Sequence, residues 1–253
     1  MTEMNRMVES MAEVETSDAP KGTPVGRRVF LGMLGLGAAG IVWGAKLQSG
    51  LERLLRPITL NDRTGITAFL PTSGRFRIYS VTGSLPSRSE ADYRLTIDGL
   101  VDKPATMTLA DLRALPQTDL VRDFQCVTGW RVPDVKWRGV TMSSLLDQAG
   151  VKPGASYLRL WSFDGEYTES LSLEQARRPD VIVAHEMQGK TVTREHGGPV
   201  RVYVAPMYGY KSLKWLERIE VTDELDPGYW EELGYDIDGW VGSSNGRHDD
   251  PTS

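Results

Sequence analysis

The chain has 253 residues, which fits one large domain or two small ones. Hydrophobic residues make up 40% of it and charged residues 25%, an ordinary globular composition that allows a sizeable core. The net charge of −5 and the lack of a long basic block argue against nucleic acid as a partner. A single cysteine, Cys126, excludes an internal disulfide and a C-x-x-C-H attachment site, so we expect no haem in this chain.

The N-terminal region is predicted to carry an export signal. Residues 1–26 are polar and acidic, which predicts disorder. Residues 27–45 begin with two arginines and continue with 17 uncharged residues. This segment resembles a twin-arginine export signal, with Gly26 where Ser or Thr is usual. An ordinary membrane anchor is the alternative, since 17 residues are at the short end of a spanning helix.

The same region predicts where the protein works. We expect it to be exported across the cytoplasmic membrane, to the periplasm or another extracytoplasmic space. Residues 29–45 form a possible membrane tether, because Trp43 is bulky where a cleavage site needs a small residue. Residues 46–75 are expected to be a linker, residues 76–242 the folded domain, and residues 243–253 a polar tail.

The first predicted elements of the domain are a strand and a helix. The stretch YRLTIDGLV alternates apolar and polar residues, which predicts a strand over 93–101. Thr108 and Asp111 have the spacing of a capping box at the start of a short helix, which Pro116 ends.

Two more short helices follow further along the chain. The stretch TMSSLLDQAGV predicts one, closed by Gly150. Ser172, as the N-cap, and Gln175, as its capping-box partner, predict the other, which Pro179 ends. The remaining predicted strands are 156–163, 180–187, 199–206 and 214–221. Because strands and short helices mix without a regular long βαβ alternation, we predict an α+β fold with mixed or antiparallel sheets.

The chemistry of Cys126 is open from its residue type alone. A lone cysteine can be a buried core residue, a catalytic thiol, an intermolecular bridge or a metal ligand. The sequence has no H-E-x-x-H zinc motif and no G-x-x-x-x-G-K-[ST] phosphate loop.

The stretch HGGPVRVYVAPMYGYKSLKW, residues 196–215, concentrates residues suited to an anion. In a strand, Val200, Val202 and Val204 share one face, and Arg201 and Tyr203 the other. An arginine at mid-strand must reach water or meet an anion. The glycine-bearing turn that follows carries two lysines and a serine, so the region is either a phosphate pocket or a solvated basic loop.

Three stretches together resemble the sulfite-oxidase-like molybdopterin-binding family. They are FQCVTGW, HGGPVRVYVAPMYGYKSLKWLERIEV and PGYWEELGYD. The resemblance covers about residues 75–242, and it is strongest to the exported bacterial branch that contains the catalytic subunit of periplasmic methionine-sulfoxide reductase. It implies a sulfite-oxidase-type fold and a mononuclear molybdenum oxidoreductase with one molybdopterin per metal.

The resemblance also implies the site. Cys126 would be the thiolate on molybdenum, which suits a soft, deprotonated sulfur ligand, and the catalytic residue. Contacts to the pterin cofactor would come from Tyr79, Ser162, His196, Arg201, Gly209, Tyr210, Lys211, Ser212 and Lys214. His185 is interpreted as a core histidine, and Trp130, Trp137 and Trp215 as core or pocket wall rather than electron relays.

The substrate is less constrained than the cofactor. Where sulfite oxidases have asparagine and arginines after the ligand cysteine, this chain has Val127 to Trp130, and Thr128 replaces the glutamate typical of the sulfoxide-reducing branch. We expect oxygen-atom transfer to or from a small molecule such as a sulfoxide or another S- or N-oxide. Electrons would be exchanged with an external carrier, a membrane haem protein or a cytochrome.

Two other classes of protein stay open. One is a metal-free thiol enzyme, with Cys126 as nucleophile and His185 or His196 as base. The other is an exported binding module that keeps the fold without the cofactor. Neither needs a phosphate site, so the basic residues near Arg201 favour the molybdopterin enzyme.

Overall fold

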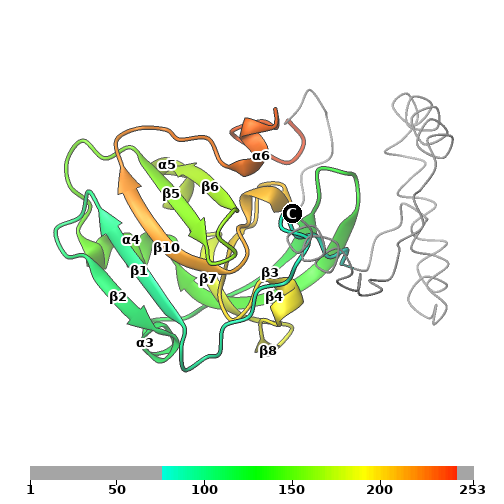
Figure 1. The fold of residues 1–253 in the computed structure, drawn as a ribbon, viewed down its shortest axis with the longest axis horizontal. Helices are drawn as coiled ribbons and strands as arrows, with labels where there is room; N and C mark the ends of the chain where they lie inside the picture. Colours follow the sequence, from blue (N-terminus) through cyan, green and yellow to red (C-terminus); the bar gives the residue numbers. More distant parts are fainter. Residues whose placement is uncertain (1–75, 244–253) are drawn as a thin grey trace, which may run out of the picture. The chain divides into compact units, whose positions relative to one another are not determined.

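The computed structural model describes residues 76–243, which hold ten strands in two sheets. The predicted disordered region, export signal, linker and most of the polar tail lie outside these residues. The first sheet, at the left of Figure 1, has the order β2-β1-β10-β5-β6. Its strands are β1 (Arg94–Gly99), β2 (Ala105–Thr108), β5 (Tyr157–Ser162), β6 (Thr168–Ser172) and β10 (Leu216–Thr222).

Pairing in the first sheet is mixed. β1 and β10 run parallel although more than a hundred residues separate them, and the other pairs are antiparallel. The second sheet has the order β3-β4-β7-β8, with β9 paired to β7, and its pairs are all antiparallel. Its strands are β3 (Thr118–Gln125), β4 (Arg131–Thr141), β7 (Val181–Met187), β8 (Lys190–Thr191) and β9 (Arg201–Val204).

Short helices connect the strands. They are α3 (Leu109–Ala114), α4 (Met142–Ala149), α5 (Leu173–Ala176), α6 (Tyr229–Glu232) and the 3-10 turns η2 (Arg194–His196) and η3 (Gly209–Lys211). The predicted capping boxes of α3 and α5 are confirmed, with Thr108 and Ser172 as the N-caps. Gly150 ends α4 in the left-handed conformation, at φ 69°, as a C-cap glycine should. The mixed sheets and short helices confirm the α+β prediction.

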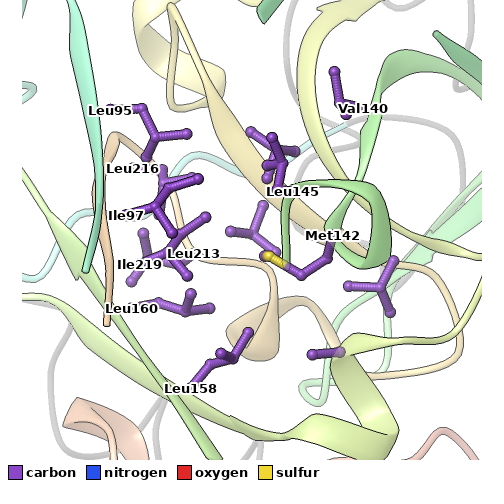
Figure 2. Packing of buried hydrophobic residues seen from close by; sticks show 14 of the residues in the cluster. Leu95, Ile97, Val140, Met142, Leu145, Leu158, Leu160, Leu213, Leu216 and Ile219 are labelled. Atoms are coloured by element: carbon purple, nitrogen blue, oxygen red, sulfur yellow. The ribbon is translucent and has the colours of Figure 1, made fainter. Parts of the chain in front are cut away.

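The main hydrophobic core lies between the two sheets. Leu95 and Ile97 of β1 and Ile219 of β10 extend into it from the first sheet, and Met142 and Leu145 of α4 pack against them (Figure 2). All five are at most 2% exposed. This core holds the second sheet against the first and leaves the far face of the second sheet for another cluster.

The strands β7 and β9 of the second sheet are buried on both faces, and this arrangement positions the site. In β7, Val181 and Val183 join the main core, whereas Ile182 and Ala184 join a second cluster around Trp137. β9 repeats the pattern, with its valines in the main core and Tyr203 in the second cluster. Within residues 76–243, no helix is both long and apolar enough to cross a membrane.

Candidate active site

Cys126 lies in the turn of the β3–β4 hairpin. Its backbone N–H donates to the carbonyl oxygen of Trp130 at 2.9 Å, and the N–H of Gly129 donates to the carbonyl of Cys126 at 3.0 Å. Gly129 has φ 94°, which a residue with a side chain rarely adopts. The thiol is free and half-buried, 3.2 Å from the hydroxyl of Thr128. The turn formers that follow Cys126 therefore bend the hairpin so that its sulfur is accessible.

A pocket with a free volume of about 170 Å³ opens beside Cys126. Three segments supply most of its apolar wall. Phe124, Val127 and Trp130 come from the hairpin, residues 76–81 come from the start of the domain, and Trp230 and Tyr235 come from its end. The pocket thus brings together residues that lie far apart in the sequence.

The basic side of the pocket is formed by His196, Arg201 and Lys214. Strand alternation points Arg201 away from the valine core and towards the pocket. Its guanidinium donates to the carbonyl oxygens of His196 and Ser212, each at 2.7 Å. The Lys214 ammonium donates to the carbonyl of Tyr79 at 2.8 Å. All these acceptors are neutral.

Gly197 explains why Lys214 and His196 can share one wall. A Cβ at Gly197 would lie 2.6 Å from the Cβ of Lys214, and the residue has φ 95°. Any side chain there would push the two segments apart. The glycine pair after His196 therefore serves close packing.

The three basic groups repel one another. Burial lowers the pKa of Arg201 to about 10. Burial, with Arg201 and Lys214 nearby, lowers the pKa of His196 to about 4, and burial with Arg201 lowers the pKa of Lys214 to about 7. In the part of the chain that the structure describes, no carboxylate lies within 4 Å of these three side chains. Basic residues outnumber acidic ones in the pocket wall, where Asp164 is the one carboxylate among the described lining residues, and this composition favours an anionic ligand.

Two buried polar atoms of pocket residues also lack partners. The indole N–H of Trp130 has no acceptor, and Oδ2 of Asp164 has no donor. The other oxygen of Asp164 accepts from the N–H groups of Glu166 and Tyr167, at 3.0 and 2.9 Å. Because unsatisfied buried polar groups are costly, these atoms suit a ligand that carries both donors and acceptors.

Most of the residues predicted for the site line this one pocket. The exposed ring of Tyr79 stacks on Trp130, with ring centroids 6.4 Å apart. Those that line the pocket are Tyr79, Cys126, His196, Arg201, Gly209, Tyr210, Ser212 and Lys214.

Two of the residues predicted to contact the cofactor, Lys211 and Ser162, do not line this pocket. Lys211 does not line the pocket, because its ammonium is fully buried and bound to Glu169 and Glu231 at 2.5 and 2.6 Å. Its ammonium is therefore occupied by these two carboxylates, and its contact with the cofactor stays a prediction. Ser162 is also absent from the wall, because its buried hydroxyl oxygen accepts from the N–H of Asp164 at 3.2 Å. Asp164 occupies the wall in its place.

His185 and the three tryptophans lie in the core or in the pocket wall. His185 is 2% exposed and contacts the side chain of Gln117 at 2.7 Å, as a core histidine would. Trp130 and Trp215 line the pocket, whereas Trp137 stacks on Tyr203 in the second cluster with centroids 4.4 Å apart. Among the described residues, neither candidate base is hydrogen-bonded to the Cys126 sulfur. The thiol-enzyme alternative thus lacks its base.

The prediction missed the wall at the end of the domain. The rings of Trp230 and Tyr235 pack edge-on with their centroids 5.2 Å apart, and the ring centroids of Tyr235 and Tyr210 are 5.4 Å apart. The hydroxyl of Tyr210 donates to the carbonyl of Asp236 at 2.6 Å, which fixes this segment to η3. The stretch PGYWEELGYD was the available signal, but its spacing alone does not show which side chains reach the pocket.

Comparison with known proteins identifies the class. Residues 82–230 match the family described as "Oxidoreductase molybdopterin binding domain", so the chain belongs to that family and is an oxidoreductase. With its mixed sheets and its relatives, it falls in the sulfite-oxidase-like group of molybdenum-binding proteins.

Three curated relatives place it more closely. The chain is 36% identical to "Uncharacterized oxidoreductase YuiH" of Bacillus subtilis, over 62% of this chain and 80% of that protein. It is 34% identical to "Putative protein-methionine-sulfoxide reductase subunit YedZ1" of Azospira oryzae, over 61% of this chain and 57% of that protein. It is 30% identical to "Sulfite oxidase" of Arabidopsis thaliana, over 56% and 45%.

A solved structure agrees with this placement. The sulfane dehydrogenase SoxCD from Paracoccus pantotrophus superposes with a TM-score of 0.51 at 28% identity, covering 55% of this chain and 40% of that one. The chain thus spans about half the length of the latter two curated relatives and less than half of the SoxCD chain.

The pocket fits the family's cofactor. Molybdopterin has a phosphate and a heterocycle with both N–H donors and acceptors. The basic side chains suit the former, and the unpartnered atoms of Trp130 and Asp164 suit the latter. Within residues 76–243, no three His, Cys, Asp or Glu side chains cluster closely enough to hold a metal. A metal on Cys126 therefore needs further ligands, which the dithiolene of a pterin supplies.

Proposed function

We propose that this protein is an exported molybdenum oxidoreductase that transfers an oxygen atom to or from a small S- or N-oxide, with a sulfoxide as the expected substrate class. The observation that carries the proposal is the free thiol of Cys126 in the same pocket as the basic residues His196, Arg201 and Lys214. A soft thiolate suits molybdenum, and the basic groups suit the phosphate of its pterin.

Four pocket residues have specific roles in this proposal. His196, Arg201 and Lys214 hold the phosphate, while Gly209 allows the η3 turn to pack closely against Phe124. A Cβ at Gly209 would lie 2.4 Å from the ring of Phe124, so a larger residue would displace that turn. When bound, the molybdenum centre supplies the two-electron redox change. The protein supplies the sulfur ligand, the orientation and the electrostatics.

The expected reaction balances with an external reductant. A sulfoxide takes two electrons and two protons and yields a sulfide and water. Trp230, Tyr235 and Val127 form an apolar and aromatic wall close to Cys126, which suits the uncharged substituents of such a molecule. The name of the Azospira oryzae relative, a sulfoxide reductase subunit, supports the same class.

The electrons come from outside this chain in this proposal. The single cysteine excludes a C-x-x-C-H haem site, so we expect a membrane haem protein or a cytochrome as the partner. The twin-arginine-like segment 27–45 supports a location across the cytoplasmic membrane, with residues 29–45 as a tether.

The decisive experiment is elemental analysis of the protein from a host that makes molybdopterin. We expect about one molybdenum per chain in the wild type and loss of most of it in Cys126→Ser, together with loss of sulfoxide reduction driven by an artificial electron donor. Thr128→Ser, which keeps a hydroxyl beside the sulfur, is the matched control and should retain the metal.

Other results would select the alternatives. A wild-type protein without metal but with an alkylatable, catalytically essential thiol would indicate the thiol enzyme. Neither metal nor activity would indicate the binding module. Oxidation of sulfite with no reduction of sulfoxides would keep the enzyme class and overturn the substrate.

A further inference from the structure

A buried ionic cluster lies behind the pocket and includes none of the residues that line it. The Nζ of Lys211 on η3 donates to Oε1 of Glu169 on β6 at 2.5 Å and to Oε1 of Glu231 on α6 at 2.6 Å. Its third hydrogen bond goes to the carbonyl of Ser170 at 2.8 Å. The three charged side chains are at most 1% exposed. One ammonium thus joins three segments that are 20 and 42 residues apart in sequence.

The cluster has one more carboxylate than ammonium groups. Burial raises the pKa of Glu169 well above its usual value, and the neighbouring Glu231 adds to this effect while Lys211 opposes it. Burial alone would lower the pKa of Lys211, but the two glutamates outweigh it and keep the ammonium charged. Burial and the neighbouring carboxylate thus favour the protonated form of Glu169.

Each arm of the cluster is continuous with the pocket wall. On η3, Tyr210 lines the pocket directly before Lys211. On α6, Trp230 directly precedes Glu231, and Tyr235 follows shortly after the helix ends at Glu232. The cluster therefore connects the aromatic wall of Trp230 and Tyr235 to the η3 turn, which lines the pocket through Tyr210.

The residues after α6 have attachments of their own, such as the bonds from Tyr210 to Asp236 and from Gln175 to Asp238, but α6 itself depends on its packing. α6 has only four residues, no side chain caps its N-terminus, and Leu233 and Ile237 nearby are 62% and 41% exposed. A helix this short is not stable by itself. Its position must come from tertiary contacts, of which the bond from Glu231 to Lys211 is the buried charged one.

We propose that Glu231, through Lys211 and Glu169, is a positioning residue that holds the Trp230–Tyr235 wall against the substrate end of the pocket. As a positioning role for substrate it rests on the proposed function, whereas the attachment of the α6 segment stands independently of it. The cluster thus contributes to substrate affinity without touching substrate or cofactor.

The charge balance makes the proposal testable without unfolding the protein. In Glu231→Leu, Glu169 can ionise and form a one-to-one pair with Lys211, so no charge is left unpaired. The α6 segment would lose its hydrogen bond to the Lys211 ammonium. In Glu231→Gln the amide oxygen still accepts from the ammonium, so this conservative variant should behave like the wild type. Glu232→Leu, at the exposed next position, is the matched control.

The measurements are hydrogen exchange of amides in residues 229–241, molybdenum content, and kcat and KM for an alkyl sulfoxide. For Glu231→Leu we expect exchange about tenfold faster or more, unchanged molybdenum, and KM raised about tenfold with kcat changed less than about twofold. Wild-type exchange in Glu231→Leu would overturn the attachment, and wild-type KM with faster exchange would overturn the positioning role.

The conservative variant and the metal content separate the two proposals. If Glu231→Gln exchanges as fast as Glu231→Leu, the ionic contact is not what holds the segment, and the proposal fails. If the wild type contains no molybdenum, the proposed function fails, while the exchange data still decide whether Glu231 holds the wall.

Discussion

At the scale of single residues, the pocket gathers several basic side chains and, within residues 76–243, one acidic side chain, Asp164. Arg201 and Lys214 are held there by backbone carbonyls, which satisfy their hydrogen bonds but not their charge. The low pKa of Lys214, about 7, measures this imbalance, since burial and Arg201 both disfavour its charged form. A bound anion would favour the charged form again, so ligand binding and protonation are coupled.

This coupling predicts a pH dependence in the cofactor-free protein. Between pH 7 and about pH 10 the unfolded chain, whose lysine pKa is about 10.4, binds more protons at Lys214 than the folded chain. The Lys214 contribution to stability therefore rises with pH through this window. The affinity for an anion changes with pH in the opposite direction. It falls as the pH rises, because binding needs the protonated ammonium of Lys214.

We accordingly expect sulfate, whose charge does not change in this range, to raise the Tm more at pH 6 than at pH 9. The affinity should differ about tenfold, and Lys214→Met should remove most of the difference. Lys190→Met, at an exposed position of β8, should leave it intact. Equal sulfate effects at both pH values in the wild type would contradict the role of Lys214.

At the scale of elements, local signals set where the short helices begin. In α3, the hydroxyl of Thr108 accepts from the N–H of Asp111 at 3.1 Å, and the carboxylate of Asp111 accepts from the N–H of Thr108 at 2.8 Å. Each bond satisfies a backbone donor that has no partner within the helix. α3 is thereby fixed between β2 and β3.

The capping box predicts a measurable loss of stability. Thr108→Ala should lower the free energy of unfolding by about 1 kcal/mol, because it leaves a helix N–H without its acceptor. Asp111→Ala should cost a similar amount, and the two costs should not add, since each bond depends on the geometry of the other. Chemical denaturation of the single and double variants tests this, and fully additive costs would argue against a reciprocal box.

At the scale of the whole molecule, the main core and the pocket share only some residues, such as Tyr167. The main cluster between the sheets contains Leu160, which is fully buried and does not line the pocket. The second cluster contains Phe124, which lines the pocket and packs beneath the η3 turn at Gly209. The main core can therefore be weakened at Leu160 without removing a residue of the pocket wall.

The separation predicts different outcomes for two core variants. Leu160→Ala should cost about 3 kcal/mol of stability and leave the molybdenum content of the folded protein unchanged, because its cavity lies away from the pocket. Phe124→Ala should cost a similar amount and also lower the metal content. Denaturation and elemental analysis of both variants would check this, and metal loss in Leu160→Ala would show that the clusters act as one.

The parts of the fold that could be predicted are those whose cause is local. Strand alternation placed Arg201 opposite the valine row, and the structure shows that arrangement. The caps at Thr108 and Ser172 depend on residues three positions away. The β3–β4 hairpin was not predicted as two strands, because its exposed first strand carries charged residues that weaken the apolar pattern.

By itself, then, the sequence indicated the molybdopterin-binding family, the α+β mixture and the direction in which Arg201 points. Only the tertiary structure decided that Lys211 binds Glu169 and Glu231 rather than the pocket, and that Asp164 replaces Ser162 in its wall. The physical reason is distance along the chain. A side chain's face follows from its neighbours in the same element, but its partner 20 or 42 residues away follows from how the elements pack.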